Sequence, residues 1–166
     1  MKSGACERSQ YGIFEKTCMM NKNVAQFAPE LTFDVVAPAV EFYKKAFGAE
    51  EELIVKNEDG GIHVAELSLQ GAIFHLHQEM PGTMERGPKG LGGTTVVLGV
   101  FVDDPDALMD RAVAAGARVL KAMKSHSYGY RQGMVEDPFG HHWMFQKVVG
   151  EVWKGVIGPD GEPGKG

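Results

Sequence analysis

The chain has 166 residues, 43% of them apolar, which is enough to form one hydrophobic core without help from a disulfide or a metal. Its formal net charge of -5 and its lack of a lysine and arginine run argue against nucleic acid and anionic membrane surfaces as partners. No apolar run approaches the roughly 18 residues that would span a bilayer. We therefore expect a cytoplasmic protein that binds neither nucleic acid nor membrane.

Residues 1–25 follow neither the helical nor the strand period, so we expect an unpacked N-terminal extension. This stretch holds the only two cysteines, Cys6 and Cys18, which we interpret as free thiols in a reducing compartment. At the other end, residues 150–166 are rich in glycine and proline and have no apolar period, which predicts a flexible tail. The folded part is then expected over residues 26–149.

The first half of that part, residues 26–80, has the pattern of a strand, a helix and three further strands. Leu31, Phe33 and Val35 alternate with polar residues, as in a strand that buries one face. A helix is expected from Pro38 to a left-handed cap at Gly48. The three further strands are predicted at residues 52–56, 63–69 and 72–77, with turns at 57–61 and 70–71.

Residues 81–93 join the two halves. They are rich in glycine and have no period, so we expect a linker that could also lie over a cleft as a flap. Met80 and Met84 would let such a flap hold an apolar ligand adaptably.

The second half, residues 94–149, repeats the order of the first. A strand at 95–102 leads to Asp104 as the N-cap and Pro105 at the first helical position, and Gly116 ends the helix. Strands are predicted at 118–121, 132–136 and 142–148, the last two joined by a turn at 137–140. The helix-opening prolines, Pro38 and Pro105, lie 67 residues apart, which indicates a duplication. The sequence thus predicts an α+β domain of two tandem βαβββ modules.

Two motifs give this pattern a family resemblance. Phe-Tyr-Lys-Lys-Ala-Phe-Gly-Ala occupies residues 42–49, and Asp-Pro-Phe-Gly-His-His-Trp occupies 137–143, after Tyr-Gly-Tyr-Arg-Gln-Gly at 128–133. Over about residues 26–149 the chain resembles the glyoxalase/bleomycin-resistance/extradiol-dioxygenase (vicinal oxygen chelate) superfamily, in its glyoxalase-like branch with the Asp-Pro-Phe-Gly-His-x-Trp ending. The resemblance implies that the two tandem βαβββ modules form a curved mixed sheet around a cleft, which is commonly completed by a second subunit. We therefore expect a homodimer that binds a small organic molecule.

The resemblance also raises the question of a metal. In catalytic relatives a divalent metal in the cleft polarises vicinal oxygens of the substrate. The family's four ligand positions fall here at Ala28 or Pro29, at Glu66, at about Val97 and at Met144. Only Glu66 matches the family's ligand in residue type, so we expect no metal cofactor.

The residues themselves leave an alternative metal site open. A two-residue turn at 70–71 would set Glu66 opposite His75 and place His77 on the same face. If their side chains converge, Glu66, His75 and His77 could bind zinc, iron, nickel or manganese. If they do not, the two histidines would line a polar pocket.

The remaining candidates are assigned by their expected position in the cleft. Glu66 is the catalytic candidate, because a carboxylate in a dry cleft is suited to proton transfer. Arg131 could clamp a carboxylate or a phosphate, or form a structural salt bridge. Trp143 and Met144 alternate, so one faces the cleft and the other packs under a helix, and the resemblance implies that Met144 faces the cleft. His141 should stabilise the adjacent turn. The candidate ligand-binding residues are His75, His77, Arg131, His142 and Met144.

The function that the sequence favours is that of a glyoxalase/bleomycin-resistance-like protein that binds an organic ligand between its modules without the usual metal. The alternative is a divalent-metal-dependent glyoxalase-like lyase or isomerase, or a dioxygenase, that uses Glu66 with His75 and His77, so enzymatic activity stays open. A purely protein-binding module is the weakest of the three readings, because curved sheets create a cavity. The sequence contains no phosphate loop, nucleophile elbow or dinucleotide fingerprint, which removes support for kinase, hydrolase and nicotinamide chemistry.

Overall fold

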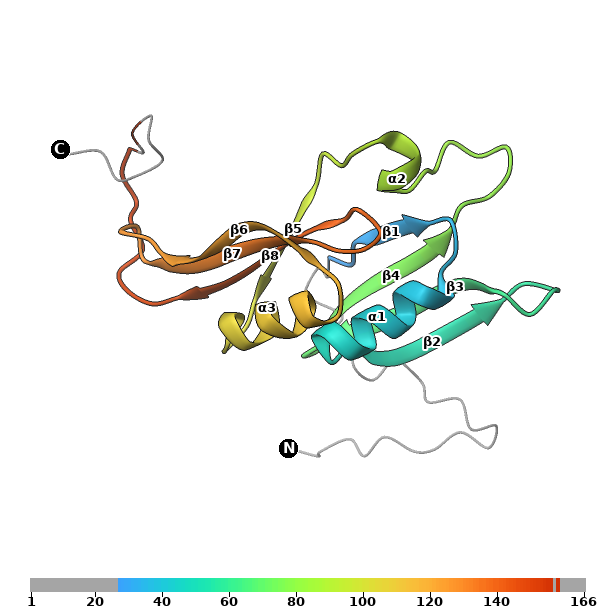
Figure 1. Ribbon diagram of the computed structural model, residues 1–166, viewed down its shortest axis with the longest axis horizontal. Helices are drawn as coiled ribbons and strands as arrows, with labels where there is room; N and C mark the ends of the chain where they lie inside the picture. The colour runs from blue at the N-terminus through green and yellow to red at the C-terminus, as the bar shows by residue number, and fades with distance from the viewer. Residues whose placement is uncertain (1–26, 157, 159–166) are drawn as a thin grey trace, which may run out of the picture.

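The computed structural model describes residues 27–156 and 158, so the predictions for Cys6, Cys18 and the extension 1–25 lie outside the described residues. The described chain forms two four-stranded mixed sheets, each with a helix packed on one face (Figure 1). This confirms the predicted α+β fold of two similar modules. Within the part that is described, no helix has the length and apolar character needed to cross a membrane.

The first module contains β1 (Glu30–Phe33), α1 (Ala37–Phe47), β2 (Glu50–Lys56), β3 (Ile62–Leu69) and β4 (Ala72–Gln78). Its sheet has the order β1-β4-β3-β2, in which β1 runs parallel to β4 and the other pairs are antiparallel. The parallel pair requires the chain to leave and re-enter the sheet, and α1 lies in that connection.

The second module repeats this topology with β5 (Val97–Phe101), α3 (Pro105–Ala114), β6 (Arg118–Ser125), β7 (Tyr130–Glu136) and β8 (His142–Val148). Its sheet has the order β5-β8-β7-β6, and β5 is again parallel to β8. The linker between the modules contains a short helix, α2 (Pro88–Leu91), which the sequence pattern did not predict.

The ends of the two long helices follow from local sequence. Pro38 lies in the first turn of α1, and Gly48 ends the helix in the left-handed region with φ 69°, which costs glycine little because it has no Cβ. The Asp104 carboxylate caps α3 by accepting a hydrogen bond from the Ala107 amide at 3.0 Å. The predicted caps at Gly48 and Asp104 are therefore confirmed.

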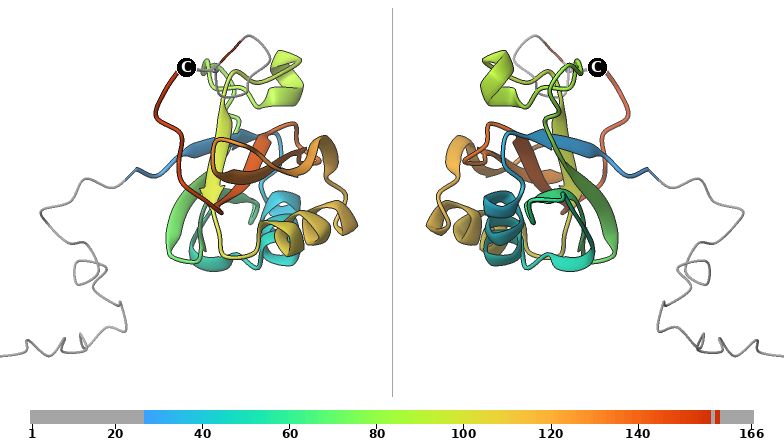
Figure 2. Two further views of the ribbon diagram at one scale, coloured as in Figure 1. Left: turned by 90° about the vertical axis from the view of Figure 1, so that its left-hand side faces the viewer. Right: turned by 90° about the vertical axis from the view of Figure 1, so that its right-hand side faces the viewer.

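One core joins the two modules. The helices α1 and α3 lie side by side on the same side of the molecule (Figure 2). The ring of Phe47 on α1 lies 4.9 Å from Trp143 and 5.3 Å from Phe145, centroid to centroid, and both of these belong to β8 of the other module. Trp143 and Phe145 are buried, as the family resemblance implied. The modules therefore pack through the sheet faces that carry the helices.

One expectation about a buried residue was wrong, and the second helix buries fewer of its apolar residues than it carries. Val35 is exposed, because the first strand ends at Phe33 and the Asp34 side chain accepts a hydrogen bond from the Val35 amide in the turn that follows. Val113 of α3 is also exposed, since Leu108, Met109 and the small Ala112 supply the buried stripe of this helix. The strand predicted at 118–121 continues to Ser125, because β7 pairs with it as far as that residue.

Candidate functional site

Each sheet has one face covered by its helix and one face that carries the predicted site residues. In the first sheet, Ala65, Leu67 and Leu76 point to the core under α1. Their neighbours along the strands point the other way, because successive side chains alternate between faces. We call this the open face of the first sheet, and its residues include Glu30, Leu53, Val64, Glu66, His75 and His77.

The open face of the first sheet brings Glu66 and His75 together. Glu66 pairs with His75 across β3 and β4, which confirms the predicted register, and the Oε2 of Glu66 lies 3.3 Å from the Nε2 of His75. The Glu66 side chain is 14% exposed and the His75 side chain 33% exposed. A carboxylate and an imidazole that are both partly withdrawn from water thus form one polar unit at this position.

His77 belongs to a separate pair. Its Nδ1 lies 3.5 Å from Oε1 of Glu30, the first residue of β1, and its ring stacks beside that of His75 with centroids 6.2 Å apart. Two glutamate–histidine pairs therefore lie next to each other on this face. The sequence analysis missed Glu30, although its place at the start of the first strand could have identified it.

The donor set of one chain does not fit the metal site of the superfamily. Among the described residues, no group of three His, Cys, Asp or Glu side chains is arranged so that it could hold a metal ion. The Glu66 and His75 pair supplies two donors, while Ala28, Val97 and Met144 offer no oxygen or nitrogen side-chain donor at the other family positions. Oxygen and nitrogen donors are what divalent zinc, iron, nickel and manganese need.

The open face of the second sheet is richer in apolar and amide groups. It carries Val97, Phe101, Tyr130, Gln132, Met134, His142, Met144 and Gln146, which the strand register places on the side away from α3. Here too a glutamate and a histidine pair between the third and fourth strands, since Nε2 of His142 lies 3.3 Å from Oε2 of Glu136. Arg118 donates a hydrogen bond to the same oxygen at 2.9 Å and, together with His142, lowers the pKa of Glu136.

Arg131 lies on the opposite face of the second sheet from His142 and Met144. Its guanidinium binds both carboxylate oxygens of Asp106 on α3, with Nε to Oδ2 at 2.7 Å, and its Nη1 donates to the Ser125 hydroxyl at 3.2 Å. The hydrogen bond from Arg131 lowers the pKa of Asp106. Arg131 could have bound a ligand or formed a structural salt bridge, and in this structure it forms the salt bridge with Asp106.

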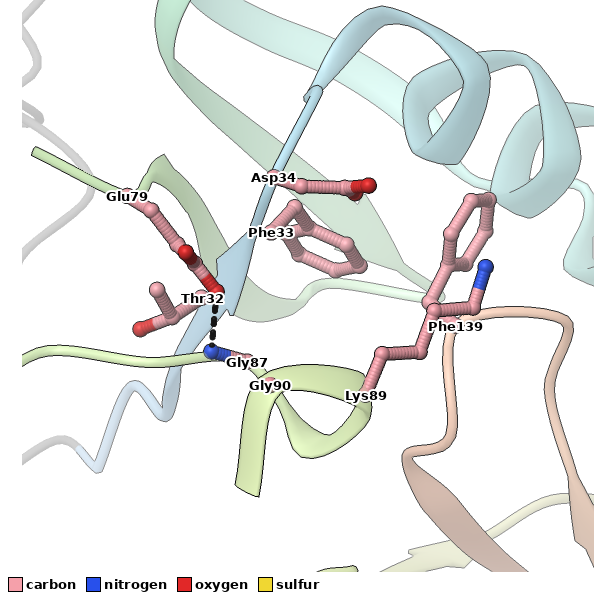
Figure 3. Close-up of a pocket in the computed structure, with 8 residues that line it drawn as sticks. All are labelled: Thr32, Phe33, Asp34, Glu79, Gly87, Lys89, Gly90 and Phe139. Atoms are coloured by element: carbon pink, nitrogen blue, oxygen red, sulfur yellow. Dashed lines mark hydrogen bonds between the residues drawn. The ribbon is translucent and has the colours of Figure 1, made fainter. Parts of the chain in front are cut away.

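A small cavity lies at the junction of the modules. It has a volume of about 280 Å³, and Figure 3 shows its lining by Thr32, Phe33, Asp34, Glu79, Gly87, Lys89, Gly90 and Phe139. Oε1 of Glu79 accepts a hydrogen bond from the Gly87 amide at 2.8 Å, and Nζ of Lys89 lies 5.6 Å from the centre of the Phe139 ring. The linker is thus fastened to the first module by Glu79 and contacts the turn of the second through Lys89.

The turn at residues 137–140 joins the modules through a buried carboxylate. Oδ1 of Asp137 accepts hydrogen bonds from the amides of Phe139 and His141, and Oδ2 accepts from Tyr43 and Trp143. The His141 ring lies 3.3 Å from the Thr32 carbonyl, and burial lowers the pKa of His141. The backbone of His141 forms hydrogen bonds in the turn, as predicted, whereas its ring contacts the first module.

Comparisons with known proteins agree with this architecture. Residues 26–145 match the family model described as Glyoxalase/Bleomycin resistance protein/Dioxygenase superfamily. The uncharacterized protein Rv0887c of Mycobacterium tuberculosis is 41% identical over 128 residues, which cover 75% of each protein. The uncharacterized protein At5g48480 of Arabidopsis thaliana is 33% identical over 119 residues, covering 66% of this chain and 70% of that protein.

Two solved structures extend the comparison to three dimensions. TioX from Micromonospora sp. ML1 superposes with a TM-score of 0.62 at 28% identity and covers 76% of this chain and 100% of its own. The Arabidopsis thaliana At5g48480 structure superposes with a TM-score of 0.59 at 31% identity, and the match covers 74% of this chain and 98% of that one. With the duplicated modules and the family match over most of its length, the chain belongs to the glyoxalase/bleomycin resistance protein/dioxygenase superfamily.

Proposed function

We propose that the chain is a glyoxalase-like protein that binds a small organic molecule on the open faces of its sheets, without a divalent metal. The observation that carries this proposal is the Glu66 and His75 pair on the open face of the first sheet, at 3.3 Å and with Glu66 only 14% exposed. A few oriented polar groups on a mostly apolar surface are typical of small-molecule sites.

The surroundings of this pair support the proposal. Leu53 lies opposite Glu66 on β2, and Val64 follows on the same face, so the polar pair has apolar neighbours on its own sheet. An apolar ligand surface could pack there while a hydroxyl, amine or carbonyl group pairs with Glu66 or His75. If the ligand is also converted, these two side chains are the groups placed to move a proton to or from it.

Thermal denaturation with a library of small organic molecules tests this proposal. A ligand that binds the native state raises the melting temperature. We expect ligands that stabilise the wild type and lose that effect in Glu66→Gln and His75→Asn. Glu58→Gln is the matched control, because Glu58 lies in the exposed turn between β2 and β3. Ligands that stabilise all four proteins equally would contradict the assignment of the site to this face.

The second candidate is a metal-dependent lyase, isomerase or dioxygenase. The observation in its favour is that His77 stacks beside His75 with ring centroids 6.2 Å apart, so rotation of one side chain would bring a third donor nearer to Glu66. Elemental analysis after incubation with iron, nickel, zinc and manganese decides between the two. About one metal per chain that is lost in Glu66→Ala would replace the first proposal with this one.

A homodimer is part of the proposal, because an open sheet face covers a ligand from one side only. Apolar side chains that are exposed on the open faces, among them Leu53 and Val55 on β2 and Val97 on β5, would be buried by a second copy. Light scattering coupled to size-exclusion chromatography measures this directly. A mass of one chain at micromolar concentration would contradict it.

A further inference from the structure

The open face of the second sheet carries an aromatic row that the fold does not need. The rings of Phe101 on β5 and Tyr130 on β7 lie 6.1 Å apart, Tyr128 lies 6.0 Å from Tyr130, and His126 stacks on Tyr128 at 4.6 Å with an interplanar angle of 17°. Phe101 is 60% exposed and is absent from the buried core. Contiguous exposed apolar side chains, unlike single ones, are typical of a binding surface.

The strand register shows that this row shares its face with polarisable and amide side chains. Phe101 pairs with Gln146, and Met134 pairs with Met144 between β7 and β8. Met134 is buried but does not belong to the core cluster under the helices, which places it on the open side. Methionine sulfur packs well against aromatic rings of varied shape.

The row is held in place by the rest of the module. The Tyr128 hydroxyl accepts a hydrogen bond from the Gln132 side-chain amide at 2.8 Å, and the Tyr128 carbonyl accepts from the Trp153 amide at 3.1 Å. Gly129, between the two tyrosines, has φ 91°, and a Cβ there would lie 2.4 Å from the Glu151 carbonyl oxygen. Segment 151–153 thus packs closely on the turn, and an ordered surface loses little entropy when a ligand binds.

The charge on this face is positive although the chain is acidic overall. Lys121 and Lys124 on β6 are both exposed. Lys121 pairs with Met134 and Lys124 with Gln132, so both lie on the open face. The carboxylate on the same face, Glu136, is bonded to Arg118 and His142. The open face of the first sheet carries the carboxylates of Glu30 and Glu66, so the second sheet offers the better surface for an anion.

At the end of the row lies a second cavity of about 200 Å³. Phe101 and Val148 from the open face line it, together with Val102, one acidic and one basic residue, Asp103 and Lys147, and Gln70 from the turn between β3 and β4 of the first module. Gln70 has φ 50°, a left-handed conformation that is uncommon for a residue other than glycine. The aromatic row therefore ends in a recess formed by both modules, where part of a ligand can be enclosed.

We infer that the open face of the second sheet binds a flat aromatic anion, such as an aromatic carboxylate, which stacks on Phe101 and Tyr130 and pairs its charge with Lys121. This deepens the proposed function by naming a ligand class, and it depends on that function only in placing the ligand on an open face. Stacking on an aromatic side chain supplies affinity for any planar ring system. The lysines add selectivity for negative charge.

Titration of ¹⁵N-labelled full-length protein with 2-naphthoate tests the inference, with 2-naphthylmethanol as the neutral analogue and cyclohexanecarboxylate as the non-planar one. We expect saturable shifts of amides in β5, β7 and β6, and weaker binding of both analogues. Phe101→Ala should weaken 2-naphthoate about tenfold, the typical loss of one stacking partner. Lys121→Gln should weaken it about two- to fivefold, as for an exposed ion pair.

The controls are Val113→Ala and Arg111→Gln, which remove an exposed apolar and an exposed cationic side chain from α3 on the other side of the second sheet. Both should bind 2-naphthoate like the wild type. No binding at millimolar concentration, or equal binding by wild type and Phe101→Ala, would overturn the inference. Equal affinity for 2-naphthoate and 2-naphthylmethanol would overturn its anionic part. In each of these cases a library ligand that depends on Glu66 would still support the proposed function.

Discussion

The Tyr43 hydroxyl of the first module donates a hydrogen bond of 2.6 Å to Oδ2 of Asp137 in the second module. Both residues are buried, and the same oxygen accepts a hydrogen bond from the Trp143 indole at 2.9 Å. A buried carboxylate is tolerated only where hydrogen bonds replace its lost water. The four donors around Asp137 satisfy this condition and tie α1 to the turn between β7 and β8.

Tyr43→Phe should therefore destabilise the fold without emptying the core. The ring is kept, but Oδ2 of Asp137 loses its hydroxyl donor in a buried site, which costs about 1.5–3 kcal/mol for a bond to a charged group. The free energy of unfolding in urea measures this loss. Tyr130→Phe, in which the hydroxyl comes from a half-buried ring on the open face, is the control and should change stability much less.

A second prediction concerns acid. Burial, the largest cause, lowers the pKa of His141 from 6.5, so the folded state holds the neutral ring. Asp137 and the Thr32 carbonyl oppose this shift without cancelling it. The unfolded chain then binds a proton more readily, and stability that is present above pH 6.5 is lost as the pH falls through the lowered pKa.

Urea denaturation at pH 7.5 and at pH 5.5 measures this dependence. The free energy of unfolding should fall between the two values in the wild type and fall less in His141→Gln, which removes the titrating ring. His126→Gln is the control, since His126 lies on the open face, away from the junction of the modules. An equal loss in all three proteins would assign the acid sensitivity to other groups.

A third prediction concerns Gly87 of the linker, where the chain passes close to the backbone of the first module. A Cβ at Gly87 would lie 2.6 Å from the Thr32 carbonyl oxygen, which is backbone and cannot move aside cheaply. Gly87→Ala should lift α2 from the first module and weaken the Glu79 hydrogen bond, at a cost of about 1–3 kcal/mol. Gly93→Ala is the matched control, because nothing lies within 4 Å of its Cβ position.

Hydrogen exchange of the amides in α2 is the measurement for this pair. Exchange should accelerate in Gly87→Ala and not in Gly93→Ala. If both variants protect α2 as the wild type does, the linker is not held by its close approach to Thr32.

The duplicated fold was accessible from sequence because its signals are local. Pro38, Gly48 and Asp104 mark helix ends by their own backbone chemistry, and the turn at 70–71 fixed the register that sets Glu66 opposite His75. A two-residue hairpin leaves little freedom of register. The sequence could therefore predict that Glu66 on β3 lies opposite His75 on β4.

Contacts between residues far apart in the sequence could not be predicted from such local signals. Nothing local to Asp137 indicates that Tyr43, 94 residues earlier, donates to it, and the same holds for the contact of Gly87 with Thr32. The side of the sheet on which Arg131 lies depended on the register of β7, whose start was predicted two residues too late. The aromatic row was missed because its members are apart in sequence and meet only once the sheet forms.

The last prediction follows from the position of Arg131. Because its guanidinium is held by Asp106 on the helix side of the second sheet, Arg131 should contribute to the packing of α3 and not to ligand binding. Arg131→Gln should lower the melting temperature slightly, less than Tyr43→Phe, because the pair is open to solvent and screened by water. The affinity for a ligand of the open faces should stay that of the wild type. A large loss of affinity in Arg131→Gln, with the melting temperature unchanged, would mean that the guanidinium leaves Asp106 to bind the ligand, and it would return Arg131 to the list of binding residues.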